Sequence, residues 1–508
     1  MAVMTFSSFG YEGSIVAVEV DIRDGAKALD IVGLSDGLVA STREIVCKAL
    51  DSAGYNMPDK RVLVSLSPAD LYKDKPMDLA VALAIFEKDM LKLSEKVLAL
   101  GGLNLDGKIT SVCGAYGAVQ TAVAAGVTCA IVPSATEKLP DGIRVYRVDT
   151  LQEAMKALTE IKDWVVPSNP DIMAPVTDGG TFVNKNDSMV TFNPLPSTEE
   201  ELDHDTNMRG LLYAMSIAAA GRLHMIVIGG PGSGKSSMLL RMTQILPNLQ
   251  PSELSSVNRI FSLAGLSKPQ EKKFARPFRV PHQTASIEGI CGGGPNCRLG
   301  EISLSHHGVL FLDEAAEFRS SVLQMLRVPL ETGQITLSRA GRSTTYPANF
   351  QLIMATNPCP CGNYGAKDKI CLCSMKSIRQ YWNKFSSPLL DRMTIRYNCD
   401  IPHEVPYRTL DETRQRIARA VSRQLKRQNK FNQELTHEEL EALPITESAR
   451  ELLGSITLAS CLTQRDTDNI LRIAQTICDM QEVDLQMTDS FIRTATRLHR
   501  DISIPVEP

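Results

Sequence analysis

The sequence predicts a multidomain α/β protein that ends in a small helical domain. Residues 13–165 alternate short β-branched runs with helical stretches, and residues 206–400 return to this alternation after a break. Residues 405–500 lack strand-like runs and are expected to be helical. A length of 508 residues agrees with about three domains of roughly 150 residues each.

The composition excludes several classes of protein. Lys and Arg total 54 against 58 Asp and Glu, which excludes a histone-like polycation but leaves room for local basic patches. No apolar run approaches the ~18 residues of a membrane helix, and no signal-peptide pattern opens the sequence. The 12 cysteines then predict reduced thiols or a metal site. We expect a soluble, cytoplasmic protein with no membrane partner.

Four segments are predicted along the chain. The first domain covers residues 1–165, with strands over 14–21, 61–66 and 129–132 and helices over 44–50, 79–86 and 117–125. Periodicity is lost over residues 166–205, where prolines and glycines fall among Asn, Asp and Ser, which predicts a linker. Residues 206–400 form the core domain, and residues 401–508 form the helical one.

A phosphate-binding loop is predicted between the strand 225–228 and the helical run 237–242. The motif G-x-x-x-x-G-K-S and the residue after it comprise Gly229, Gly230, Pro231, Gly232, Ser233, Gly234, Lys235, Ser236 and Ser237. Backbone N–H groups of such a loop surround phosphates, Lys235 reaches the β and γ phosphates, and Ser236 binds Mg²⁺. ATP and Mg²⁺ are therefore the expected cofactors, because the flanking strand and helix make an accidental glycine-rich turn a poor alternative.

A second apolar strand is predicted to bring acidic groups to the same site. Residues 308–314 form an apolar run that ends in Asp313 and Glu314. Asp313 is expected to hold Mg²⁺ through water, and Glu314 to act as the general base on the attacking water. Without the phosphate-binding loop, the same run would be equally compatible with a solvated strand end.

Three more polar residues follow in the order found in AAA+ ATPases. A third apolar strand ends at Asn357, the place where that class carries an amide that orients the water. Arg392, in a Leu-Leu-Asp-Arg run, resembles the arginine finger that completes a neighbouring subunit's site. Arg465, at the start of a predicted helix, resembles the sensor 2 arginine. A surface ion pair is the alternative for either arginine.

Seven runs of sequence together resemble the YifB/ComM family of magnesium-chelatase-like AAA+ ATPases. They are residues 31–34, 66–71, 276–282, 300–304, 308–314, 355–362 and 388–392. The resemblance covers almost the whole chain in order, and the first two runs are similar to a domain related in fold to the Lon protease domain. The family implies a hexameric ring, and its ComM-type members are ATP-driven DNA motors that promote branch migration during natural transformation.

The sequence departs from related patterns at several places. Lon has a catalytic serine where this chain has residues 73–79 and a catalytic lysine where it has residues 114–118. No serine stands in the first stretch and no lysine in the second, so proteolysis is not expected. Residues 205–208 replace the family's Val-x-Gly-Gln segment near the adenine, and Gln283 and Gly230 are further differences. None of these differences removes a catalytic atom.

Three basic segments are candidates for contact with DNA. The resemblance places residues 268–279 in an insertion in the second helix of the core and residues 337–342 in a hairpin, both facing the pore of the ring. The first contains Lys268, Lys272, Lys273, Arg276 and Arg279 against Glu271. The third is a basic helix over residues 414–430 with Arg416, Arg419 and Arg423 on one face. Basic pore residues suit a phosphate backbone, and a solvated face or inter-subunit ion pairs are the alternatives.

Four cysteines form a candidate metal site after the third strand. They are Cys359, Cys361, Cys371 and Cys373. Four thiolates suit tetrahedral zinc, which would staple the loop without taking part in the chemistry. The C-x-C spacing is less diagnostic than C-x₂-C, so reduced loop cysteines are the alternative. Cys291 and Cys297 are expected to be incidental.

The sequence thus predicts an Mg²⁺-dependent ATPase that assembles into a hexameric ring and acts on DNA. The expected output is helicase-like or branch migration, with ATPase activity stimulated by DNA. The alternative is a chelatase-type motor subunit that remodels a protein partner for metal insertion. As far as the resemblance goes, such subunits lack the Lon-like first domain, which favours the DNA motor.

Overall fold

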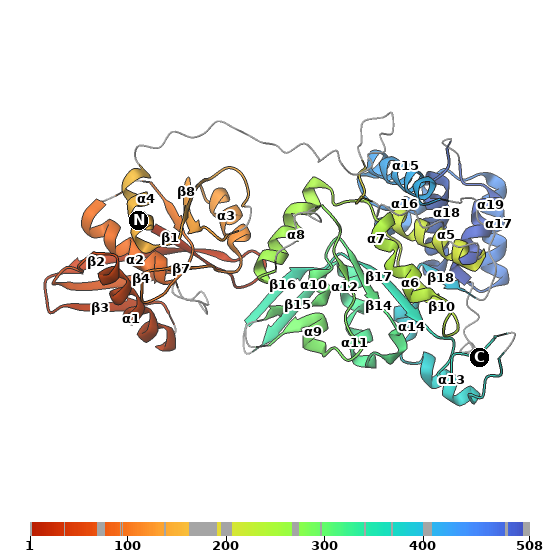
Figure 1. Cartoon of the computed structure of the whole chain (residues 1–508). Coiled ribbons are helices and arrows are strands. Elements are labelled where there is room, and N and C mark those ends of the chain that lie inside the picture. The colour runs from red at the N-terminus through yellow and green to blue at the C-terminus, as the bar shows by residue number, and fades with distance from the viewer. Residues whose placement is uncertain are drawn as a thin grey trace.

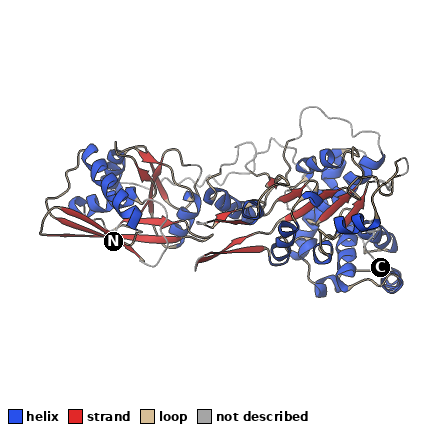
Figure 2. Ribbon diagram, turned by 90° about the horizontal axis from the view of Figure 1, so that it is seen from below, coloured by secondary structure: helices blue, strands red, loops and turns tan. Residues whose placement is uncertain are grey.

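The computed structural model describes most of the chain (Figure 1). The described residues are 3–34, 36–68, 77–91, 93, 95–136, 139–161, 190–194, 206–266, 274–294, 297–339, 342–366, 369–399, 409–482 and 486–500. An N-terminal α/β domain lies at one end of an elongated molecule and the C-terminal helices at the other (Figures 1 and 2). The predicted multidomain α/β class is confirmed.

The N-terminal domain is built on a seven-stranded mixed sheet in the order β3-β4-β2-β1-β5-β8-β9. The strands are β1 (Val3–Ser7), β2 (Ser14–Arg23), β3 (Ala28–Val32), β4 (Arg61–Ser67), β5 (Val97–Ala99), β8 (Cys129–Pro133) and β9 (Arg144–Val148). β2 pairs antiparallel with β1 and β4, and the other neighbours are parallel. The strands predicted from the sequence lie within β2, β4 and β8.

The helices of this domain cover the sheet. They are α1 (Asp36–Ser52), α2 (Asp78–Phe86), α3 (Ala115–Ala124) and α4 (Leu151–Glu160), with a π-helical turn η1 (Glu87–Leu91) and a small ribbon of β6 (Gly102–Leu103) and β7 (Ile109–Thr110). All of α2 is buried, because α1, α4 and the sheet pack around it. An apolar helix without a polar face is therefore stable at the centre of this domain.

The core domain contains a five-stranded sheet in the order β11-β14-β17-β10-β18. The strands are β10 (Met225–Ile228), β11 (Phe278–Arg279), β14 (Val309–Leu312), β17 (Gln351–Thr356) and β18 (Ile395–Asn398). Every neighbouring pair is parallel, so all carboxyl ends lie at one edge of the sheet. Side chains that follow β10, β14 and β17 are thereby brought together.

Short helices and two hairpins surround this sheet. The helices are α5 (Thr206–Gly221), α6 (Lys235–Leu240), α7 (Met242–Ile245), α8 (Pro251–Leu263), α9 (Ile287–Cys291), α10 (Glu301–Leu304), α11 (Ser320–Met325), α12 (Arg327–Thr332), α13 (Met375–Trp382) and α14 (Ser387–Leu390), with a 3₁₀ turn η4 (Ala315–Glu317). β12 (Gly292–Gly293) pairs with β13 (Arg298–Leu299), and β15 (Gln334–Arg339) with β16 (Arg342–Pro347).

The C-terminal residues form the predicted helical domain. Its helices are α15 (Leu410–Gln428), α16 (His437–Glu441), α17 (Glu447–Ala459), α18 (Gln464–Asp479) and α19 (Asp489–Arg500), with a 3₁₀ turn η5 (Asn432–Glu434). They pack on α5 and β18 and share one apolar core with them. Within the predicted linker, only residues 190–194 are described, and Val190 and Phe192 are buried in this same core. These two residues therefore pack with the core domain, although the sequence placed them in the linker.

The N-terminal domain docks on helix α8 of the core domain. In Figure 1, α8 lies on the side of the core domain that faces the N-terminal domain. The buried Arg259 donates to the backbone oxygens of Tyr11 (2.9 Å) and Glu12 (2.6 Å). The Gly114 amide donates to the Ser262 carbonyl oxygen at 2.8 Å, at the start of α3. Residues 114–118, where Lon would carry its lysine, thus contact α8. The other stretch compared with Lon lies, over residues 73–76, outside the described part of the chain.

Candidate nucleotide site

The predicted phosphate-binding loop connects β10 to α6, as its sequence context requires. Gly232 and Gly234 have φ angles of +81° and +73°, the left-handed region in which glycine is favoured. These two residues turn the chain so that α6 begins at Lys235. The loop is therefore shaped by its glycines before any phosphate is bound.

Lys235 fills the centre of this loop. Its side chain is buried, and Nζ donates to the carbonyl oxygens of Gly229 (2.6 Å) and Gly230 (2.8 Å). Nζ also lies 3.3 Å from Oδ1 of Asn357, which follows β17. Because β17 is the direct neighbour of β10, the predicted sensor amide stands beside the predicted phosphate-binding lysine.

The two predicted Mg²⁺ ligands lie in contact. Ser236 Oγ donates to Asp313 Oδ1 at 2.8 Å and thereby joins α6 to the end of β14. A hydroxyl and a carboxylate are oxygen ligands of the kind that Mg²⁺ prefers, and Mg²⁺ usually keeps several waters besides. These two residues therefore fit the ion without any displacement of the backbone elements that carry them.

Glu314 is exposed immediately beyond Asp313 and adopts an unusual backbone conformation. Its φ of +49° and ψ of +48° are left-handed, which is uncommon for a residue with a side chain. Its amide donates to Asp313 Oδ1 at 3.0 Å, so the carboxylate of Asp313 fixes this turn. Such strain is often retained at functional sites. Glu314 is thus turned away from the strand direction at the edge of the sheet that carries Lys235.

Arg392 and Arg465 lie elsewhere. Arg392 precedes β18 and pairs with Glu331 of α12 at 2.7 Å, while Arg465 Nη2 lies 3.9 Å from the other Glu331 oxygen. A cavity lined by Glu331 is also lined by His224, Gly308 and Gln351, which stand at the amino ends of β10, β14 and β17. The two arginines are therefore close to each other but at the sheet edge opposite the phosphate-binding loop.

Three family models match successive parts of the chain. Residues 208–405 match the family model described as magnesium chelatase, subunit ChlI, residues 18–136 match subunit ChlI of Mg-chelatase, and residues 408–497 match its C-terminal model. The uncharacterized protein YifB of Escherichia coli is 33% identical over 498 residues, which cover 95% of this chain and 94% of YifB. The competence protein ComM of Haemophilus influenzae is 31% identical over 499 residues, 94% of this chain and 92% of ComM.

The chain belongs to the YifB/ComM family of magnesium-chelatase-like AAA+ proteins. Its parallel sheet, phosphate-binding loop and C-terminal helices are the AAA+ motor parts of this family. In the described ranges, no helix combines the length and apolar character needed to cross a bilayer.

In the described part of the insertion predicted to face DNA, two arginines form ion pairs within the chain. Arg276 is buried and pairs with Glu253 at 3.0 Å, and Arg279 pairs with Glu301 through two bonds of 2.6 and 2.8 Å. Both guanidiniums are paired inside the chain, whereas contact with DNA, a solvated face or inter-subunit ion pairs was expected for them. Lys268, Glu271, Lys272 and Lys273 lie outside the described residues.

A buried ionic cluster around Glu253 was not predicted from the sequence. Glu253 accepts from Arg222 and Arg276, and Arg222 lies over the ring of Phe431 with its guanidinium carbon 3.6 Å from the centroid. Burial alone would raise the pKa of Glu253, but the two guanidiniums outweigh burial and hold it well below its usual range. The cluster joins α8, which carries the N-terminal domain, to the C-terminal helices.

The predicted hairpin exists as β15 and β16. Leu337 is buried in the core, whereas Ser338 faces Ser343 across the strands with their hydroxyls 2.8 Å apart. The hairpin also approaches the N-terminal domain, since a Cβ on Gly10 would lie 2.6 Å from Thr344 Oγ1. The tip at residues 340–341 and the side chains of Arg339 and Arg342 lie outside the described part.

The basic helix α15 uses its arginines inside the chain. Arg419 donates to the Met480 carbonyl oxygen, and Arg423 donates to those of Asp479 and Gln481, at distances of 2.9 to 3.1 Å. Cations at the end of a helix are favoured because the last carbonyls are unpaired and carry partial negative charge. The expectation that these residues form a solvated, inter-subunit or DNA-binding face is therefore corrected for Arg419 and Arg423, which cap α18.

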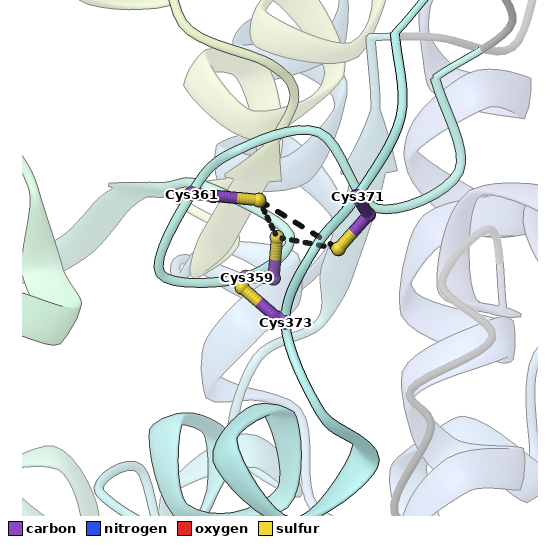
Figure 3. A group of neighbouring side chains, drawn as sticks. All are labelled: Cys359, Cys361, Cys371 and Cys373. Carbon is purple, nitrogen blue, oxygen red and sulfur yellow. Dashed lines mark hydrogen bonds between the residues drawn. The ribbon is translucent and has the colours of Figure 1, made fainter.

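The four loop cysteines converge on one point (Figure 3). Sγ of Cys359 lies 3.4 Å from that of Cys361 and 3.7 Å from that of Cys371, and those two are 3.6 Å apart. All four sulfur atoms, with Cys373, lie within 4.8 Å of one another. The group can hold a metal ion, as expected from the sequence. Cys291 and Cys297, in contrast, are buried in the apolar core.

The C-x-C spacing does not prevent this convergence. Cys371 and Cys373 are half-buried, whereas Ile370 and Leu372 are 82% and 90% exposed. Successive side chains of this segment thus point in opposite directions, so Cys371 and Cys373 point to the same side of the chain. The Asn363 amide, which hydrogen-bonds the Cys361 sulfur, and the neighbouring thiol of Cys359 lower the pKa of Cys361 to about 6.

Proposed function

We propose that this protein is an Mg²⁺-dependent ATPase that assembles into a hexameric ring and moves DNA strands. The observation that carries the ATPase part is the meeting of Lys235, Ser236, Asp313 and Asn357 at one edge of a parallel sheet. Lys235 and Ser236 begin α6, Asp313 follows β14 and Asn357 follows β17. Because these elements are far apart in the sequence, the fold brings the four residues together.

The chain's own residues account for hydrolysis. The amides of the glycine loop and Lys235 bind the β and γ phosphates, in place of the carbonyl oxygens that Lys235 now contacts. Ser236 and Asp313 hold Mg²⁺, which neutralises charge on the phosphates when bound. Asn357 orients a water, and Glu314 accepts its proton as the water oxygen bonds to the γ phosphorus. The bond from that phosphorus to the β–γ bridging oxygen breaks, and ADP is the leaving group.

The opposite placement of Arg392 supports a shared site between subunits. Arg392 precedes β18, and the phosphate-binding loop lies at the sheet edge where the strands end. The four residues of β18 span about 13 Å between Arg392 and that edge. Within one chain, Arg392 and Arg465 are thus directed to a surface away from the nucleotide. In a ring, that surface meets the nucleotide site of the next subunit, where Arg392 would exchange Glu331 for the γ phosphate.

Three features support DNA as the substrate. A relative of nearly equal length is named a competence protein, which points to the acquisition of DNA. The sequence concentrates Lys268, Lys272 and Lys273 in the predicted insertion and places Arg339 and Arg342 at the hairpin. Lysine and arginine contacts of this kind bind the phosphate backbone without selecting a base sequence. The first domain, which we propose to be Lon-like and non-proteolytic, docks on α8 and approaches the hairpin at Thr344.

A chelatase-type motor is the second candidate, because the matched family models bear the name of a magnesium chelatase subunit. Such a motor would use the same ATPase cycle to remodel a protein partner. It predicts ATP turnover that is indifferent to DNA and sensitive to that partner.

Strand exchange tests the proposal directly. A fluorescently labelled three-strand junction is incubated with protein, Mg²⁺ and ATP, and release of the displaced strand is followed with time. We expect release with the native chain and none with Glu314→Gln or with a non-hydrolysable ATP analogue. Efficient ATP hydrolysis without strand release from three-way, four-way or forked DNA would contradict a DNA motor. Light scattering of Glu314→Gln with ATP should give the mass of six chains.

A further inference from the structure

The segment 358–374 is a loop held firmly at its base. It connects the end of β17 to α13, and α13 packs back on the strand. Trp382 Nε1 donates to the Pro358 carbonyl oxygen at 3.0 Å, and the hydroxyls of Tyr381 and Thr356 lie 2.9 Å apart. Both ends of the loop are thereby fixed beside Asn357. Within the described residues of the loop, the four cysteine sulfurs gather at one point.

The sulfur separations are those of a tetrahedral metal site. Zinc–sulfur bonds of about 2.3 Å at tetrahedral angles place neighbouring sulfurs about 3.8 Å apart. Three pairs lie at 3.4, 3.6 and 3.7 Å, and the fourth sulfur, that of Cys373, is within 4.8 Å of the others. A small inward movement of Cys373 completes the tetrahedron.

The same distances disfavour the other uses of four cysteines. A disulfide requires sulfur atoms about 2.05 Å apart, and all four thiols are free. An iron–sulfur cluster separates its thiolates by its own inorganic atoms, which leaves no room for sulfurs in mutual contact. One ion at the centre remains, and four sulfur ligands in a tetrahedron select zinc or a single iron.

The cysteine loop also touches the phosphate-binding loop. Gly362, which follows Cys361, is buried and has a φ of +79°. A Cβ at this residue would lie 2.5 Å from Cδ of Pro231, and the Gly362 carbonyl oxygen lies 3.4 Å from the Cβ position of Gly230. The turn that follows the second cysteine thus contacts the phosphate-binding loop from outside.

We infer that Cys359, Cys361, Cys371 and Cys373 bind one structural Zn²⁺, and that this ion locks Gly362 against Pro231. The zinc site is a support for the phosphate-binding loop and takes no part in hydrolysis. Four thiolates close its coordination shell, so no position is left for water or substrate. This inference goes beyond the proposed function, since it requires neither DNA nor a ring.

Metal content is the first test. The full chain is purified without a metal-affinity tag from cells grown with zinc, and bound metals are measured by plasma emission. We expect about one zinc per chain in the native protein, none in Cys371→Ser/Cys373→Ser, and full retention in the control Cys461→Ser, which changes an exposed cysteine elsewhere. Iron with visible absorption, disulfides by thiol titration, or no metal in the native protein would each overturn the assignment.

Two glycines of the loop test the coupling to the nucleotide. Gly362→Ala and Gly365→Ala carry the same backbone strain, with φ of +79° and +80°, but only Gly362 would meet Pro231, since nothing lies within 4 Å of the added atom at Gly365. Both variants should keep zinc. Only Gly362→Ala should bind a fluorescent ATP analogue several-fold more weakly. Equal affinity in the two variants would overturn the supporting role, and neither result depends on DNA.

Discussion

Ser236 Oγ and Asp313 Oδ1 are 2.8 Å apart, and this hydrogen bond joins the first turn of α6 to the end of β14. The two oxygens come from motifs far apart in the sequence, yet they meet because β17 alone separates β10 from β14. A single chain therefore brings together the proposed phosphate-binding loop and the proposed Mg²⁺ ligands.

Lys235→Ala should weaken ATP binding strongly. The variant loses the ammonium that would contact the β and γ phosphates, and charged hydrogen bonds of about 1.5–3 kcal/mol correspond to roughly 10- to 100-fold in affinity. Binding of a fluorescent ATP analogue measures the effect. Lys384→Ala is the control, because Lys384 also bonds a carbonyl oxygen, that of Ala316, but lies outside the loop. Equal binding by the two variants would exclude the assigned role of Lys235.

Glu314→Gln should bind ATP and lose turnover. Removal of a general base typically lowers the rate by about 10²- to 10⁴-fold while the phosphate contacts of Lys235 remain. Steady-state phosphate release and nucleotide affinity are measured together. Glu317→Gln, an exposed carboxylate in the next turn, is the control and should behave as the native protein. Normal turnover by Glu314→Gln would transfer the role of base to another group.

Arg392→Ala and Glu314→Gln should complement each other when mixed. Each is expected to be inactive alone, because one lacks the finger and the other the base. Arg392 stands at the sheet edge opposite the phosphate-binding loop, so a mixed ring contains sites that draw a native finger from one variant and a native base from the other. ATPase activity is measured across mixing ratios. Absence of activity at every ratio would show that Arg392 does not act across subunits.

Arg259→Ala should loosen the N-terminal domain. The buried guanidinium bonds Tyr11, Glu12 and Thr121, and each such charged bond contributes about 1.5–3 kcal/mol. Faster amide hydrogen exchange is expected at residues 9–13 and 115–121, with the five-stranded sheet unaffected. The exposed Arg298 of β13 offers the control variant Arg298→Ala. Unchanged exchange in both segments would mean that other contacts hold the domains together.

The buried His224 should make stability depend on pH. Burial, with the nearby Arg472 and Arg392 charges, lowers its pKa to about 4 from 6.5. The unfolded chain therefore binds the proton first, and the free energy of unfolding falls as pH drops from about 6.5 towards 4, by about 3 kcal/mol for this group. His224→Asn keeps an acceptor for the Leu352 amide and should flatten this slope in urea unfolding. The exposed His282→Asn should leave the slope unchanged.

Much of the fold and of the site could be predicted from the sequence. Short β-branched runs such as 225–228 indicated strands, and the order of Lys235, Asp313 and Asn357 along the chain indicated the site they form. These predictions depend on local periodicity and on the meeting of parallel strand ends, both of which are properties of short segments.

Pairing between distant charges could not be predicted. Arg276 and Arg279 look like free basic residues because the sequence does not say that Glu253 and Glu301 face them. In the same way, Arg419 and Arg423 find the last carbonyls of α18, which lie far along the chain. The contact between Gly362 and Pro231 could not be predicted either, because a glycine and a proline in separate loops do not indicate that they touch. Long-range packing decides all three.

A motor that acts on DNA should hydrolyse ATP faster when DNA is bound. Steady-state ATP hydrolysis by the purified chain, with and without branched, single-stranded and duplex DNA at two salt concentrations, tests it most directly. We expect severalfold stimulation that weakens at the higher salt, because the contacts are to phosphates, and the most effective DNA would identify the junction. Active hydrolysis that no DNA changes at either salt concentration would contradict a DNA motor and favour the remodelling of a protein partner.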